Sequence, residues 1–227
     1  FSGTNLYTGD TTISAGTFQV TGALADTALS VSSGATYDVD ASDAIGSIAG
    51  EGSIDIADSV TLTAGVLNSN TTFAGVISGL GGFTKVGSGT TTFSGTNLYT
   101  GDTTISAGTF KVTGALADTA LSVSSGATYD VDASDAIGSI AGSGSIDLAD
   151  SVTLTAGGSG DTEFGGVISG EGGFTKAGSG ITTFSGTNLY TGATTISAGT
   201  FQVTGALANT ALSVSDGATY DVDASDA

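Results

Sequence analysis

The acidic side chains of the segment YDVDASDA are the residues of this sequence best suited to chemistry. Three aspartates fall within six residues, and the segment occurs three times along the 227-residue chain. They are Asp38, Asp40 and Asp43; Asp130, Asp132 and Asp135; and Asp221, Asp223 and Asp226. Closely spaced carboxylates supply the oxygen ligands that Ca²⁺ prefers. Each segment is therefore a weak candidate calcium site, and Ca²⁺ is the one cofactor that the sequence suggests.

The spacing of these aspartates departs from known calcium loops. Asp43 stands where the EF-hand loop requires a glycine, and no glutamate closes the loop. The Gly-rich nonapeptide of calcium-binding β-rolls is also absent. The alternative, which we favour, is that all three aspartates of a segment are solvated on outward strand positions. Equal melting temperatures in EDTA and in millimolar Ca²⁺ would exclude calcium binding.

Catalysis by the same acids is disfavoured. A glycoside hydrolase needs two carboxylates in a cleft, one of them with a raised pKa. The chain has no His, Cys or Arg to act as a base or nucleophile. The acidic segments also repeat identically, whereas a catalytic site normally occurs once. We therefore predict that this chain is not an enzyme.

Near-perfect repetition determines how these segments must be positioned. The stretch FSGTNLYTGDTTISAGTFQVTGALADTALSV begins at Phe1 and returns at Phe93 and Phe184. The chain thus divides into two full copies, residues 1–92 and 93–183, and a partial copy, 184–227. The first 65 residues of the two full copies differ only at Gln19/Lys111, Glu51/Ser143 and Ile56/Leu148. Repetition of this kind predicts stacked units that form one continuous solenoid.

Composition narrows the classes of partner. The formal net charge is −19, with Lys85, Lys111 and Lys176 as the three basic side chains. A nucleic-acid partner is excluded because phosphate contacts need a basic surface, and no run of residues is long and apolar enough to span a membrane. We expect Lys85 and Lys176 to pair with nearby acids. Hydrophobic residues make up 39 % of the chain, which argues against disorder.

Alternating side chains predict short strands. In the segment Thr17–Val20, Phe18 and Val20 share one face, and Gln19 lies on the other. Copies two and three carry Lys111 and Gln202 in place of Gln19, so this position faces water. Glycine interrupts every segment long enough for a helix. The sequence therefore predicts an all-β protein.

The spacing of large apolar residues predicts how the strands stack. Phe18, Tyr37, Ile54, Phe73 and Phe93 are separated by 17 to 20 residues. A coil of about 18 residues suits one turn of a parallel β-helix, with five coils in each 92- or 91-residue copy and about 12 in all. We expect the first four of these residues to lie over one another in a single interior column.

Residues 81–110, with the sequence GGFTKVGSGTTTFSGTNLYTGDTTISAGTF, resemble the autotransporter-associated β-strand repeat. The pattern recurs at 173–201. Phe83, Phe93 and Phe110 stand where that repeat usually carries leucine. The resemblance implies a right-handed parallel β-helix, an extracellular location at the bacterial cell surface, and a role in secretion or surface display.

These observations predict a structural protein. We expect an extracellular β-solenoid segment of a long, repetitive bacterial surface protein or filament, such as a stalk, fibre or biofilm matrix scaffold. Its expected partners are further copies of the repeat joined end to end, with lateral self-association or surface ligands as additional possibilities. The alternative function is an autotransporter adhesin passenger that binds host or carbohydrate ligands through the variable loops 66–72 and 158–163.

Overall fold

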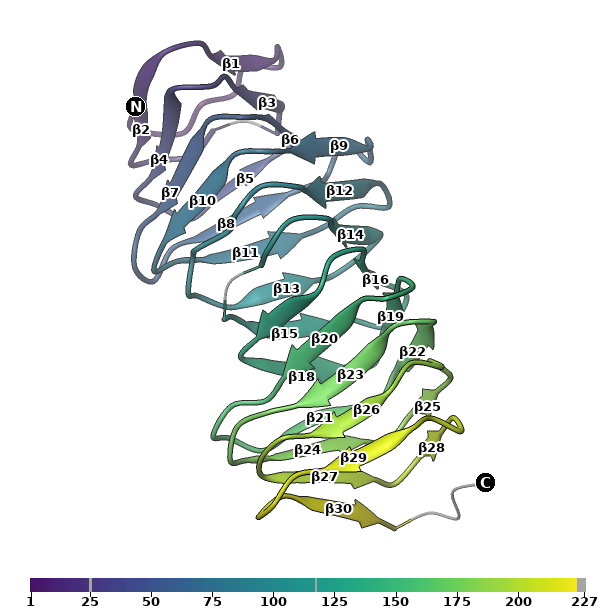
Figure 1. Ribbon diagram of the computed structural model, residues 1–227. Helices are drawn as coiled ribbons and strands as arrows, with labels where there is room; N and C mark the ends of the chain where they lie inside the picture. Colours follow the sequence, from purple (N-terminus) through teal and green to yellow (C-terminus); the bar gives the residue numbers. More distant parts are fainter. Residues whose placement is uncertain (25, 117, 224–227) are drawn as a thin grey trace.

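The computed structural model describes residues 1–24, 26–116 and 118–223 as a β-solenoid of about 11 turns (Figure 1). Every strand pair in this part of the chain is parallel, with neighbours roughly 19 residues apart. The described residues form strands and turns, and none of them forms a helix that could cross a membrane. The predicted all-β solenoid is confirmed.

Three ladders of strands run along the rod, and we call them faces 1, 2 and 3. Face 1 is an eleven-stranded sheet that lies to the right in Figure 1. Its strands are β1 (Thr11–Ile13), β3 (Ala28–Val31), β6 (Ser47–Gly50), β9 (Thr71–Phe73), β12 (Thr90–Phe93), β14 (Thr109–Val112), β16 (Thr128–Val131), β19 (Ser145–Leu148), β22 (Val167–Gly170), β25 (Thr187–Asn188) and β28 (Ala206–Leu207).

Face 2 is a ten-stranded sheet. Its strands are β5 (Asp43–Ile45), β8 (Thr61–Ala64), β11 (Gly82–Lys85), β13 (Thr103–Ile105), β15 (Ala120–Val123), β18 (Ser139–Gly142), β21 (Thr162–Phe164), β24 (Ile181–Phe184), β27 (Thr200–Val203) and β30 (Thr219–Val222).

Face 3 consists of two sheets, one after the other along the rod. The first contains β2 (Gly16–Val20), β4 (Ala35–Val39), β7 (Ser53–Ile56) and β10 (Val76–Gly79). The second contains β17 (Asp135–Ile137), β20 (Thr153–Ala156), β23 (Gly173–Lys176), β26 (Thr194–Ile196) and β29 (Leu212–Val214). The isolated bridges Ile77↔Asn97 and Thr96↔Ala115 continue the ladder between them.

The length of a copy is not a whole number of turns, so the prediction of five coils per copy is wrong. Phe18 on face 3 pairs with Tyr37, then Ile54, then Ile77, and the bridge to Asn97 completes four turns. The chain then passes through β13 on face 2 before it reaches Phe110, the equivalent of Phe18, in β14 on face 1. One copy therefore covers four and two-thirds turns, with just under twenty residues in each. The third equivalent strand, β27, lies on face 2.

This fractional turn also breaks the predicted interior column. Phe18, Tyr37 and Ile54 do lie in register on face 3, but Ile77 follows them instead of Phe73. Phe73 belongs to face 1, where it pairs with Phe93. The prediction failed because it used a constant coil length, whereas the steps from Phe18 to Asn97 vary between 17 and 23 residues.

A cluster of three phenylalanines fills the core where β11, β12 and β14 meet. The ring centroids of Phe83 and Phe93 are 4.9 Å apart, and those of Phe93 and Phe110 are 4.7 Å apart in an edge-to-face arrangement. All three side chains are fully buried. The next copy repeats the cluster with Phe174, Phe184 and Phe201. Aromatic pairs in this geometry add about 0.5–1.5 kcal/mol beyond the burial of their area.

We expect Phe93→Ala to lower the free energy of unfolding by about 3–5 kcal/mol, because it empties the middle of this cluster. Phe93→Leu keeps most of the volume, and should cost clearly less. Urea denaturation followed by circular dichroism measures both. The outward-facing neighbour Thr92 provides the control, Thr92→Ala, which should change stability by less than about 1 kcal/mol. Equal effects of Phe93→Ala and Thr92→Ala would contradict this assignment of the core.

Candidate functional site

The third aspartate of the first acidic segment points into the core, contrary to the prediction that it faces solvent. Asp43 in β5 is buried. Its Oδ1 accepts hydrogen bonds from the backbone N–H groups of Leu24, at 2.8 Å, and Ala44, at 3.0 Å. Its Oδ2 accepts a 2.6 Å hydrogen bond from the hydroxyl of the buried Tyr37. Asp43 is therefore a structural carboxylate, and its oxygens are engaged by donors of the core.

Asp135 repeats this arrangement at the start of β17. Its carboxylate accepts hydrogen bonds from the backbone N–H of Leu116 at 3.0 Å and from the hydroxyl of Tyr129 at 2.9 Å. Leu116 lies one turn earlier on the same face, so the side chain links two turns at a point where no pair of named strands does. Burial is the main cause that raises the pKa of both Asp43 and Asp135 above the usual range for a carboxyl.

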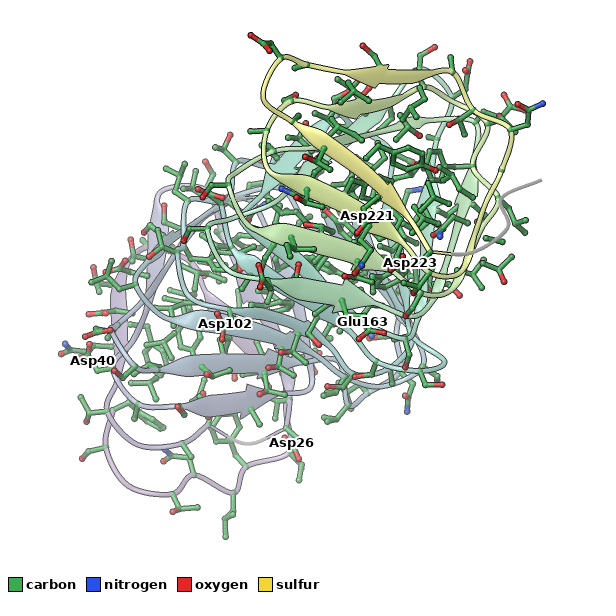
Figure 2. All side chains as sticks on the ribbon, turned by 90° about the horizontal axis from the view of Figure 1, so that it is seen from below. Asp26, Asp40, Asp102, Glu163, Asp221 and Asp223 are labelled. Carbon is green, nitrogen blue, oxygen red and sulfur yellow. The ribbon has the colours of Figure 1, made fainter. Side chains whose placement is uncertain are left out.

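The other two aspartates of each segment lie outward, as predicted. In copy one, Nε2 of Gln19 donates a 2.6 Å hydrogen bond to Asp40. In copy two, Nζ of Lys111 pairs with Asp130 at 2.9 Å and also with Asp132. In copy three, Gln202 donates to Asp221 at 3.1 Å and to Asp223 at 2.9 Å. Asp226 lies outside the described residues. Figure 2 shows labelled acids on separate parts of the rod.

The fold therefore separates the candidate calcium ligands. Asp38 and Asp40 lie on the outer surface of the rod, whereas Asp43 lies inside it. Within the described ranges, no three acidic side chains come together in a group that could hold a metal ion. Calcium binding by these segments remains a prediction, and its support is reduced to pairs of outward carboxylates.

Lys85 and Lys176 are fully buried, and backbone carbonyls bind them in place of the acids that we expected. Nζ of Lys85 donates hydrogen bonds to the carbonyl oxygens of Val86, Gly87 and Ala107, at 2.6, 2.9 and 3.2 Å. Ala107 belongs to the next turn, so the ammonium group joins two successive corners of the rod.

Lys176 repeats the contacts with Ala177, Gly178 and Ala198. Its three donor–acceptor distances, 2.5, 2.9 and 3.2 Å, match those of Lys85 closely. Burial lowers the pKa of both lysines. We call each of these arrangements a lysine clip.

Two shallow polar grooves recur at equivalent positions of the two full copies. The first, of about 390 Å³, is lined by Asp58, Thr61, Gly82, Thr84 and Asp102, among others. The second, of about 280 Å³, has Asp150, Thr153, Gly173 and Thr175 in the corresponding places. Leu80 and Asp102 of the first groove are replaced by Glu171 and Ala193 in the second. Hydroxyls and carboxylates line both grooves, and neither contains a base paired with a nucleophile.

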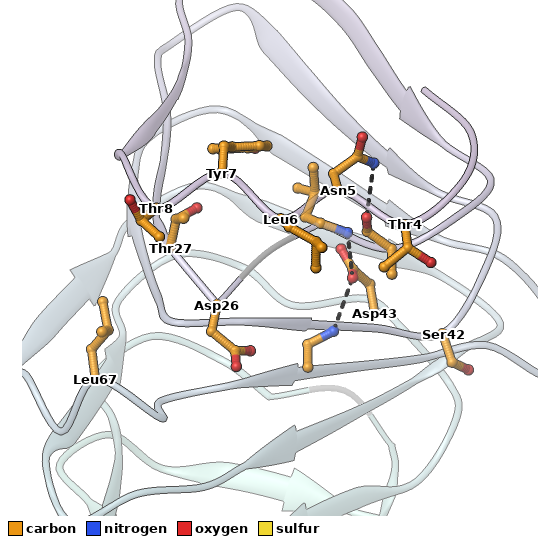
Figure 3. Close-up of a pocket in the computed structure, with 13 residues that line it drawn as sticks. Thr4, Asn5, Leu6, Tyr7, Thr8, Asp26, Thr27, Ser42, Asp43 and Leu67 are labelled. Atoms are coloured by element: carbon orange, nitrogen blue, oxygen red, sulfur yellow. Dashed lines mark hydrogen bonds between the residues drawn. The ribbon is translucent and has the colours of Figure 1, made fainter.

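A larger groove of about 700 Å³ lies beside the first turn (Figure 3). Leu6, Tyr7, Leu24 and Leu67 contribute its apolar wall, and the buried Asp43 lies beneath it. Tyr7 is exposed here. In the next two copies the equivalent side chains, Tyr99 and Tyr190, are completely buried under a preceding turn. The groove therefore corresponds to a space that the preceding turn occupies further along the rod.

Comparison with known proteins identifies the part of the chain that carries the aromatic clusters and the lysine clips. The model of the passenger-associated-transport-repeat matches residues 1–20, 83–112 and 174–203. The chain carries three passenger-associated transport repeats. It is also 32 % identical over 164 residues to the adhesin BmaC autotransporter of Brucella suis. That alignment covers 67 % of this chain but 5 % of the length of the relative. No solved structure matches the chain.

The matched passenger-associated transport repeat has a clear structural role in this rod. Residues 83–112 run from β11 through β12 and β13 to β14, which is more than one turn. They contain all three phenylalanines of the first cluster and the whole first lysine clip. The repeat thus encodes the contacts by which one turn packs on the next, and its most regular residues point inward.

The alternation of side chains was the signal that could have located the buried charges. In Gly82–Lys85, Phe83 points inward, so Lys85, two residues later, must point inward too. In Asp43–Ile45, the inward Ile45 likewise places Asp43 inside. The rule that charged residues face water led to the opposite prediction in both cases.

We expect acidification from pH 7 towards pH 4 to raise the melting temperature. The folded-state pKa values of Asp38, Asp43, Asp130 and Asp135 are raised above the ordinary value of 3.8, mainly by burial. The stability that their protonation contributes is fully present below the unfolded-state pKa and is lost as the pH rises through the folded-state pKa. Repulsion within a chain of net charge −19 acts in the same direction.

Thermal melts followed by circular dichroism at low protein concentration provide the measurement. A melting temperature that falls steadily over this pH range would contradict the raised pKa values. Asp135→Asn provides a further check, because it removes one of the buried carboxylates and should reduce the dependence on pH.

We expect Lys85→Met to destabilise the rod by about 1–3 kcal/mol, because the variant leaves the buried carbonyls of the clip without their donor. Lys111→Gln is the matched control. Lys111 forms a surface ion pair, the other two copies carry glutamine at this place, and the expected cost is below about 1 kcal/mol. Denaturant midpoints distinguish the two variants. A larger loss for Lys111→Gln would show that the clip contributes little.

Proposed function

We propose that this chain is a structural segment of a bacterial surface passenger, in which it acts as a rigid, protease-resistant spacer. The observation that carries the proposal is the location of the repeated residues. The aromatic clusters, the buried aspartates and the lysine clips all join one turn to the next along the axis. A protein whose recurrent contacts serve axial stacking is built for length and stiffness.

The comparisons support a surface role for the segment. Its repeats are of the passenger-associated kind, and its relative is named as an autotransporter adhesin. An extracellular or cell-surface location agrees with both. The absence of cysteine and the acidic surface suit a secreted rod that depends on backbone hydrogen bonds and packing for its stability.

Adhesion is the second candidate function, and the variable loops favour it. Residues 66–72 carry Val66 and Leu67, both exposed, whereas the shorter loop 158–163 carries Asp161 and Glu163. A position that differs in this way between otherwise near-identical copies is free of the packing constraint. In an adhesin, such loops would be the places where ligand contacts differ between copies.

The two candidates predict different results when one full copy is deleted. We expect removal of residues 93–183 from the whole surface protein to shorten its projection from the cell by about 22 Å, from four and two-thirds turns of about 4.8 Å each. Cell adhesion should be retained. Cryo-electron tomography measures the projection, and a cell-binding assay measures adhesion.

A matched variant isolates the loop. Replacement of residues 66–72 by the residues 158–163 of the second copy keeps the turn and removes Val66 and Leu67. Loss of adhesion in this variant, with unchanged projection, would favour the adhesin function over the spacer. An unchanged projection in the copy-deletion variant would contradict the spacer.

A further inference from the structure

Each copy of the repeat presents its surface from a different side of the rod. The equivalent strands β2, β14 and β27 lie on faces 3, 1 and 2. Two-thirds of a turn separate each from the next in addition to four whole turns. The same face is therefore reached again only after three copies and 14 turns. This pattern follows from the length of the repeat, because a copy of five whole turns would keep every equivalent residue on one face.

The exposed leucine of the segment Asn-Leu-Tyr-Thr-Gly follows this pattern. Leu6, Leu98 and Leu189 are 82 %, 58 % and 55 % exposed, and each copy carries one of them. Leu98 follows Asn97, which bridges to Ile77 on face 3, and its N–H donates to the carbonyl of Ile77. Leu189 follows Asn188 on face 1, and its N–H donates in the same way to Ile168.

The first leucine belongs to the remaining face. The bridge Thr4↔Ala23 and the hydrogen bond from the N–H of Leu24 to Asp43 place this part of the chain in line with β5 on face 2. Three chemically identical apolar side chains thus occupy three different faces, about 22 Å apart along the axis for each step.

We propose that the repeat length makes this rod a three-directional display, which offers any contact encoded once per copy to several separate molecules of one partner arranged around it. A rod with whole-turn repeats would instead suit one extended, flat surface lying along a single face. The display deepens the proposed surface role and depends on it for its biological meaning. Its geometry is tested on the isolated chain, so the display can fail while the surface role stands.

The charge of the outer surface agrees with separate partners and argues against close packing of rods face to face. Lys85 and Lys176 are buried, and Lys111 is already paired with Asp130 and Asp132. Among the described residues, no lysine remains on the surface to pair with the acids of a neighbouring rod. Two such rods repel each other along their whole length.

The absence of native cysteine permits a direct test of this display by labelling. In one variant, Leu6, Leu98 and Leu189 are all replaced by cysteine and biotinylated, which puts one label on each face. In the matched control, Ser30, Lys111 and Leu189 are replaced. These three share one outward column of face 1, with four turns between successive members. Circular dichroism verifies that both variants are folded.

The measurement is the number of monovalent streptavidin molecules bound per rod, determined by native mass spectrometry. We expect three on the leucine variant. We expect at most two on the face 1 control, because neighbours about 19 Å apart on one side exclude each other. The display is overturned if the leucine variant binds no more than the control.

Distances between spin labels provide a second test that is independent of the binder. The pair Gln19→Cys and Lys111→Cys lies 92 residues apart on two different faces. The pair Thr72→Cys and Ser169→Cys lies 97 residues apart on one face, five turns along the same column. We expect the 92-residue pair to be farther apart than the 97-residue pair. The reverse order would show that the copies are in phase and would overturn the proposal.

Discussion

The structure depends on the hydrogen bonding of each turn to the turn before and the turn after it. A single turn has an apolar inner side that it cannot cover by itself, and parallel ladders about 4.8 Å apart bring the next turn over it. Every described strand takes part in such a ladder. The core is consequently a stack of side chains in register, and whatever lies at one inward position must fit the residues directly above and below.

This constraint explains why so much glycine is needed at the corners. Gly79 has φ near 106° and approaches the carbonyl oxygen of Ile56 so closely that a Cβ atom would lie 2.0 Å from it. Gly170 repeats this geometry against Leu148. A side chain at either place would separate two turns, and the ladders on both sides of the corner would be lost. The glycine content is thus a result of tight axial spacing, not a sign of flexibility.

The buried polar groups have a place in the same scheme. Successive turns are alike enough to pair in a wrong register, and an apolar column alone distinguishes poorly between neighbours. The bonds from Leu116 to Asp135 and from Lys85 to Ala107 each require one particular partner on the adjoining turn. A shift by one turn would leave a charge buried without its partners, which costs more than a misplaced methyl group. These groups therefore favour one register over the others.

The sequence by itself determined the all-β solenoid, the three copies and the outward position of Gln19 and Lys111, because two-residue alternation and exact repetition are local properties. It also held the signal for the inward Asp43 and Lys85, which the usual preference of charge for water obscured. Only the tertiary structure decided how far the chain turns within one copy. Corner lengths change the count of residues per turn, so the step of 23 residues from Ile54 to Ile77 places Phe73 on another face and rotates each copy relative to the last. No local pattern reports that rotation, since it is the sum of all the corners in a copy.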